Sequence, residues 1–144
     1  MPDSPLSALL HQLVGWLRDP VIAALIAATA IALWEGATAV GERLGGLGRL
    51  RRAGDGPAAE RIGRRRIERA DLLARIGPML GLMGTLIPLG PGLASLGRGD
   101  LKVLAEAVTV AFDTTVLGLL VGITGFLLGR LRRRWYDQLL DEIE

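Results

Sequence analysis

The chain has 144 residues, half of them hydrophobic, and its mean hydropathy of +0.38 is too high for an ordinary soluble domain. The absence of cysteine and the single histidine exclude disulfides and cysteine nucleophiles and leave little for a zinc or other metal site. The net charge of +2 conceals two blocks of arginine beside apolar stretches, which indicates membrane topology more often than nucleic-acid binding.

Residues 1–19 predict a short amphipathic helix at the membrane interface. Ser4 followed by Pro5 is typical of a helix N-terminus, with a capping side chain and a proline in the first turn. The leucines that follow share one helical face, and Trp16 lies beside them. The stretch lacks a basic n-region, so a signal peptide is not expected.

Residues 20–40 predict the first transmembrane helix, because they are apolar over a length that crosses about 30 Å of hydrocarbon. Trp34 suits the aromatic belt at the membrane interface. Glu35 is the one charge in this stretch. It could belong to an ion path, but the favoured interpretation is a carboxylate at the headgroup level close to Arg43.

Residues 41–75 predict a basic cytoplasmic loop, since ten arginines outnumber five acidic residues there. Its glycine-rich part, Gly45–Pro57, predicts a flexible turn. From Ala58 a helix is expected to run into the next span. The stretch RIGRRRIER could bind RNA or anionic lipid, but we interpret it as a positive-inside anchor and expect no nucleic-acid partner.

Residues 76–97 predict the second transmembrane helix, which contains no charged residue. Thr85 lies at the edge of a stripe of small residues formed by Gly77, Gly81 and Gly84. Pro88 and Pro91 are expected to kink or end this helix near its outer side. A short outer turn follows, and Asp100 is the expected N-cap of the third helix.

Residues 101–130 predict the third transmembrane helix, with Asp113, Thr114 and Thr115 at its middle. A carboxylate at this depth costs about 2.5–3.5 kcal/mol and by default marks a functional site. A second small-residue seam follows on one face, at Gly118, Gly122, Gly125 and Gly129. Residues 131–144 predict a cytoplasmic C-terminal helix that packs on the basic loop helix or on a neighbouring subunit.

The helical repeat separates two polar faces in the third span. Asp113 shares one face with Glu106 and Thr109, whereas Thr115 lies roughly opposite, on the face of Gly118. One face could line a pore while the other meets a neighbour. The spacing leaves open which of Asp113 and Thr115 faces the pore.

The motifs GPMLGLMGTLIPL and AFDTTVLGLLVG, between about residues 75 and 131, resemble the two pore helices of the MotA/TolQ/ExbB proton channel family. The resemblance implies a homo-oligomer, a pentamer, in the plasma (inner) membrane, around a single-span partner of the ExbD/TolR/MotB type. In it, Thr85 and Thr115 match the pore-lining threonines. One departure is that Val110 stands where TolQ and ExbB members carry a glutamate.

Two other functions are open. Gly97–Asp100 matches the GxGD motif of intramembrane aspartyl proteases, with Asp113 as the second acid, but these acids are 13 residues apart on one helix. A membrane scaffold that conducts nothing is the other alternative.

We predict an all-α membrane protein with three transmembrane helices, an N-terminal interfacial helix and cytoplasmic helical extensions. The N-terminus is expected outside and the C-terminus in the cytoplasm. No nucleotide-binding, metal or nucleophile motif is present, so the expected function is a proton (or sodium) channel subunit without enzymatic activity or cofactor.

Overall fold

The computed structural model describes residues 4–143, and these fold into long helices with no strand among them. The elements are α1 (Pro5–Gly41), the π-helix η1 (Glu42–Gly46), α2 (Leu47–Ala53), α3 (Gly56–Leu96) and α4 (Leu101–Ile143). Helices α1, α3 and α4 each contain a stretch long and apolar enough to cross a membrane. The predicted all-α membrane fold with three spans is therefore confirmed.

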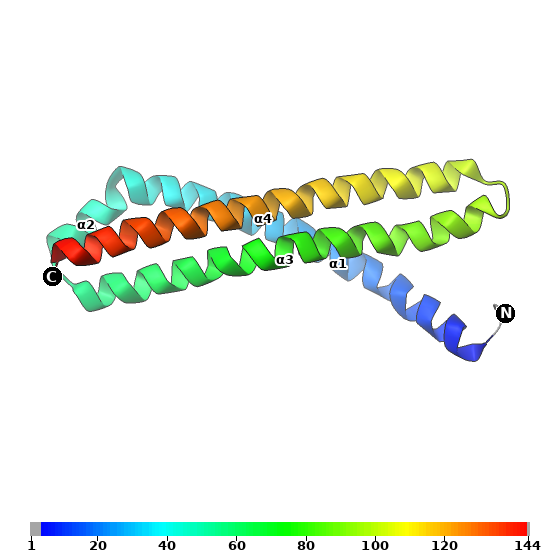
Figure 1. The fold of residues 1–144 in the computed structure, drawn as a ribbon, viewed down its shortest axis with the longest axis horizontal. Coiled ribbons are helices and arrows are strands. Elements are labelled where there is room, and N and C mark those ends of the chain that lie inside the picture. The colour runs from blue at the N-terminus through cyan, green and yellow to red at the C-terminus, as the bar shows by residue number, and fades with distance from the viewer. Residues whose placement is uncertain (1–3, 144) are drawn as a thin grey trace.

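Helices α3 and α4 form an antiparallel pair that is in contact along its whole length (Figure 1). The connecting turn contains Gly99 at φ 78°, a left-handed conformation that glycine adopts without strain. Asp100 caps α4 as expected, because its Oδ1 accepts a hydrogen bond from the Val103 amide at 3.2 Å. Between Ala111 and Arg132, the buried residues of α4 include a series at alternating steps of three and four, the repeat of a coiled coil.

The prolines of α3 do not end it. Pro78, Pro88 and Pro91 all lie inside the helix, which continues to Leu96, so of the expected kink or end at Pro88 and Pro91 the end is excluded. Inside a membrane, a neighbouring helix and local adjustments compensate the backbone bonds that proline removes. Here α4 lies against α3 beyond both prolines, where an added Cβ at Gly92 would approach the Ala107 side chain to 2.8 Å.

Most of the loop is helical, so the expected flexible turn over Gly45–Pro57 was also wrong. Helix continues through η1 and α2 to Ala53, and the reversal takes only Gly54 and Asp55. Gly54 is left-handed at φ 65°, and Asp55 Oδ1 accepts a hydrogen bond from the Ala58 amide at 3.1 Å. The leucines of this segment, Leu47 and Leu50, pack on a cluster of Ala59, Tyr136 and Leu139, and this burial favours helix over loop.

Helix α1 joins two stretches that the sequence predicted as separate units, 1–19 and 20–40. It runs unbroken from Pro5 to Gly41 with Pro20 inside, and Ser4 caps it through the Ser7 amide at 3.2 Å. Its 37 residues span about 56 Å, nearly twice the hydrocarbon thickness. Its first part diverges from the α3–α4 pair (Figure 1), and residues 8–20 are exposed. Residues 1–3 and 144 of the predicted terminal helices lie outside the described part.

The second part of α1 covers one side of the α3–α4 pair. Ala28 and Ala32 pack with Leu73 and Val121, and further along Ala39 packs with Ala70 and Leu128. Within residues 4–143, no other helix packs on the opposite side of the pair. The pair therefore has one edge closed by α1 and one free edge.

Candidate functional site

The α3–α4 contact is made by small residues from both helices. An added Cβ at Gly118 would lie 2.6 Å from the Gly77 carbonyl oxygen and the Gly81 Cα, and one at Gly122 would lie 2.7 Å from Pro78. Such distances leave no room for a side chain, so the backbones approach as closely as glycine permits. The glycines of the two predicted seams all face the partner helix, and at Gly129 the nearest atom is the Asp71 carboxylate, not backbone; they are Gly77, Gly81, Gly84, Gly118, Gly122, Gly125 and Gly129.

Thr114 is part of this contact. Its side chain is 6% exposed and lies against Gly84, where an added Cβ would meet the Thr114 Cβ at 2.6 Å. Its hydroxyl donates to the carbonyl oxygens of Val110 and Ala111 at 2.9 and 3.0 Å, inside its own helix. Thr114 thus fills the space between α3 and α4.

Thr85 and Thr115 occupy matching positions on the free edge. The Asp71 carboxylate lies over Gly129, and one heptad further Pro78 lies over Gly122. The helices are antiparallel and keep one register, so the next pair in this series is seven residues after Pro78 on α3 and seven before Gly122 on α4. These positions are Thr85 and Thr115. Both threonines are half-buried. Leu73 and Val121, which pack on α1, lie about 120° around their helices from Thr85 and Thr115, so the pair of threonines lies on the edge away from α1.

The two hydroxyls on this edge are oriented by their own helices. The Thr85 hydroxyl donates to the Leu82 carbonyl oxygen at 2.6 Å, and the Thr115 hydroxyl donates to that of Ala111 at 2.8 Å. A hydroxyl that donates to the backbone still has oxygen lone pairs that accept. This edge can bond water or a protonated acid without placing a fixed charge in the membrane.

The carboxylates of α4 lie away from this edge. Asp113, Glu106 and Thr109 are all exposed on the outer face of the helix. Asp100 caps the start of α4, 13 residues before Asp113, so about 20 Å of helix separates the two acids. Carboxylates at this separation cannot share a proton, as the aspartyl-protease alternative requires.

A buried charge cluster joins α1 to the pair at the end nearest the arginine block, and the sequence analysis missed it. Arg132 is fully buried and donates to Glu35 Oε2 at 2.5 Å, to Thr38 Oγ1 at 2.9 Å and to Glu42 Oε1 at 3.1 Å. Glu35 is 4% exposed and pairs with Arg132, so the expectation that it lies near Arg43 was wrong in its partner. Glu35 and Glu42 are one heptad apart, and Arg132 follows the seam residue Gly118 by two heptads. These spacings could have indicated that Arg132 faces the two glutamates.

Two further side chains complete the cluster. The Arg66 guanidinium on α3 pairs with the same Glu42 carboxylate, and Tyr136 is buried beside it. Burial raises the pKa of the Tyr136 phenol above its ordinary value, and the Glu42 charge adds to this, while Arg66 and Arg132 oppose it. Glu35, Glu42, Arg132 and Arg66 balance in charge, which limits the cost of burying them.

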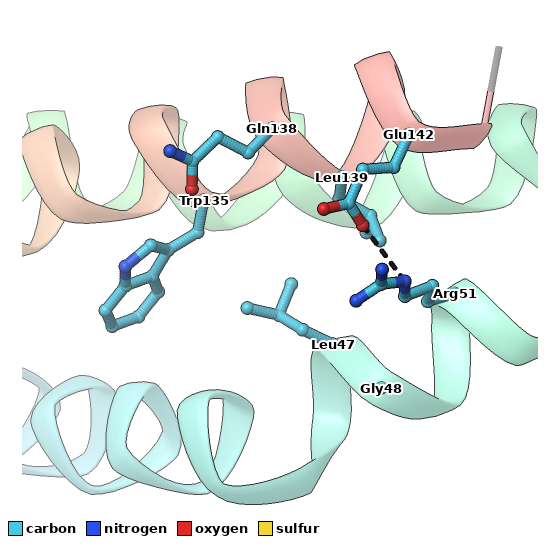
Figure 2. Close-up of a pocket in the computed structure, with 7 residues that line it drawn as sticks. All are labelled: Leu47, Gly48, Arg51, Trp135, Gln138, Leu139 and Glu142. Carbon is cyan, nitrogen blue, oxygen red and sulfur yellow. Dashed lines mark ion pairs between the residues drawn. The ribbon is translucent and has the colours of Figure 1, made fainter.

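A cavity of about 170 Å³ opens where α2 meets the end of α4 (Figure 2). Leu47, Trp135 and Leu139 form its apolar wall, and an ion pair of Arg51 with Glu142 closes one side at 3.0 Å. The groups of this ion pair are largely exposed, and the nearest lining residue of α4, Trp135, follows Thr115 by 20 residues, about 30 Å of helix. Within residues 4–143 no three acidic or histidine side chains gather into a metal site.

The fold and the site together define a multi-pass membrane protein built on a tightly packed two-helix unit with a polar free edge. The chain belongs to the MotA/TolQ/ExbB proton channel family, whose sequence model matches residues 57–144. This match takes in nearly all of α3 and the whole of α4, the helices that carry the threonines. The family resemblance inferred from the two motifs is thereby confirmed.

One curated relative is a biopolymer transport protein ExbB homolog of Methanothermobacter thermautotrophicus, 36% identical over 78 residues. The alignment covers 50% of this chain and 26% of the relative, so the chain spans only about a quarter of that protein. No solved structure matches the chain significantly.

Proposed function

We propose that this chain is the pore-forming subunit of a homopentameric proton channel that uses an ion gradient to drive a partner with a single transmembrane segment. In this proposal the chain works without enzymatic activity or a cofactor. The family supports a proton-channel role, and the finer features are argued from the chain itself.

The observation that carries the proposal is the position of Thr85 and Thr115 at one register on the edge opposite α1. If copies assemble with α1 outward, this edge lines the axis and the hydroxyls form a polar ring at mid-membrane. Such a ring would hydrogen-bond a carboxyl group of a central partner helix or the water around it. Thr114, packed between α3 and α4, would hold the ring in place.

Assembly is supported by the apolar surface that a single copy leaves exposed. In the most apolar 18-residue stretch of each spanning helix, at most 33% is buried within the chain. Asp113 is exposed near the middle of α4, where a carboxylate facing lipid costs about 2.5–3.5 kcal/mol. A neighbouring subunit that covers this face would relieve the cost. We therefore place Thr115 toward the axis and Asp113 toward a neighbour.

The orientation follows from the arginines. We propose that residues 41–75 and the C-terminus lie in the cytoplasm, with the 97–100 turn and the N-terminus outside, in the plasma (inner) membrane. The cytoplasmic ends of α3 and α4 would then project beyond the membrane together with α2. The charge cluster of Arg132 would lie at the inner membrane surface.

Thr115→Val tests the proposal, because it keeps the volume and removes only the hydroxyl. The full-length chain is reconstituted in liposomes with and without a coexpressed single-span partner, and ion flux is followed with entrapped pH- and sodium-sensitive dyes. We expect partner-dependent flux in the wild type and its loss in Thr115→Val, with the oligomer intact. Thr109→Val is the matched control on the outer face of the same helix and should conduct normally.

Asp113→Asn should leave assembly intact and reduce the flux or shift its pH dependence. Normal flux in Thr115→Val together with a silent Asp113→Asn would show that the faces are assigned backwards. A wild-type assembly that binds the partner but passes no ions would be a scaffold, which is the alternative function.

A further inference from the structure

The free edge continues beyond the threonines to a charged pair at the cytoplasmic end of the spanning helices. Asp71 on α3 and Arg133 on α4 form an ion pair, with the carboxylate 36% and the guanidinium 58% exposed. Asp71 lies two heptads before Thr85, on the side of α3 that carries Pro78. It is therefore on the same edge as the threonines and on the opposite side from the Arg132 cluster.

The spacing places this pair at the membrane surface. Fourteen residues of helix separate Asp71 from Thr85, a rise of about 21 Å, which exceeds half of the roughly 30 Å hydrocarbon thickness. Between them the edge presents Pro78 over Gly122, which offers no polar side chain. Toward the arginine-rich end, the edge thus presents the hydroxyls of Thr85 and Thr115, then the apolar Pro78, and then the carboxylate of Asp71.

Gly129 gives the carboxylate its position. A Cβ added at Gly129 would lie 2.9 Å from the Asp71 Oδ1 atom. The carboxylate therefore rests against the backbone of α4. Its other oxygen, Oδ2, is held by Arg133, one turn further along α4. The carboxylate is thereby kept beside the edge and in contact with α4, whereas the more exposed Glu68 pairs only with Arg64 of its own helix.

We propose that Asp71 is the acceptor that takes the ion at the cytoplasmic end of the path, with Arg133 as its exchangeable counter-ion. This inference rests on the proposed function, since it assumes that the free edge lines the path. An arriving proton or sodium ion binds the carboxylate as the bond to Arg133 breaks. Its release to the cytoplasm restores the carboxylate and the ion pair, so nothing is consumed.

The test compares Asp71→Asn with Glu68→Gln in the reconstituted channel. Glu68 is the matched control, because it is exposed one turn away on the same helix and pairs with Arg64 of that helix, not with α4. We expect the initial flux to fall about tenfold or more in Asp71→Asn and to stay at the wild-type level in Glu68→Gln. A proton gradient and a sodium gradient, applied separately, show which ion Asp71 takes.

Gly129→Ala provides a second variant that keeps every charge. The added methyl group meets only the flexible end of Asp71, so the helices can stay packed while the carboxylate is displaced. We expect a loss of flux in the same direction as in Asp71→Asn, with unchanged oligomer size.

Wild-type flux in both Asp71→Asn and Gly129→Ala, alongside a blocked Thr115→Val, would overturn the role of Asp71 and leave the channel assignment standing. Equal losses in Asp71→Asn and Glu68→Gln would also overturn it, since a general surface-charge effect would then explain both. Absence of flux in the wild type would overturn both proposals.

Discussion

Replacing Arg132 by methionine removes the one fully buried cation of the charge cluster while keeping most of the side-chain volume. Two carboxylates then lose their common partner. Glu35 keeps only Arg69, whose exposed side chain lies 3.7 Å away, and Glu42 keeps Arg66, which is partly exposed. These exposed partners are weak substitutes, because solvent screens them.

The structure indicates the size of the effect. Both carboxylates are about 5% exposed at the side chain, so Arg132→Met leaves buried negative charge without full compensation. Breaking a buried pair by removing one partner typically costs about 3–5 kcal/mol. This corresponds to a drop of roughly 10²–10⁴-fold in the folding equilibrium. Adding Glu35→Gln to Arg132→Met should recover part of this stability, because it removes one of the uncompensated charges.

The stability is measured by denaturant titration in mixed micelles, followed by tryptophan fluorescence. Trp135 packs against the Ala39, Ala70 and Leu128 cluster, so its emission reports the contact of α1 with the pair. Arg134→Met, two residues from Arg132 and exposed, is the control and should change little. A cost below about 1 kcal/mol for Arg132→Met, or no recovery in the double variant, would refute the reasoning.

Three further predictions follow from the topology, the packing and the tyrosine. Cysteines that replace Arg52 or Asp141 should not react with an impermeant thiol reagent in intact cells, whereas a cysteine that replaces Arg98 should be labelled. Labelling of only one of the positions 52 and 141 from outside would contradict three spans. Gly118→Leu should separate α3 from α4 and abolish the oligomer or its expression, because even a Cβ would lie 2.6 Å from the α3 backbone; an unchanged oligomer size in detergent would contradict the packing. Tyr136 is the single tyrosine, so absorbance near 295 nm should show it ionising above about pH 10 in the folded protein. Since its folded pKa is raised, its contribution to stability is complete below the unfolded pKa and is lost as pH rises through the folded one. A phenol that titrates at its ordinary pKa would rule out this linkage.

The charge cluster and the free edge lie on different sides of the α3–α4 pair, the first against α1 and the second away from it. Arg132 fixes α1 to the pair on the closed edge, and Thr85, Thr115 and Asp71 follow the open one. A variant in the cluster should therefore change stability before it changes ion selectivity. A variant on the open edge should do the reverse.

The sequence by itself determined the three spans, the helix ends at Ser4 and Asp100, and the two glycine seams. These features depend on local composition and on the helical repeat, which act over a few residues whatever the rest of the chain does. The motifs on α3 and α4 also determined the family, since Thr85 and Thr115 belong to short stretches with a characteristic spacing.

Only the tertiary structure decided how the faces pair. Pro88 and the glycines near 45 are helix breakers by local preference, but packing against neighbouring helices favours continued helix. The partner of Glu35 lies 97 residues away at Arg132, and a single span cannot show which distant charge will meet it. Likewise, the antiparallel register of α3 and α4 brings Asp71, Thr85 and Thr115 to one edge, because that relation depends on two helices meeting through their glycines.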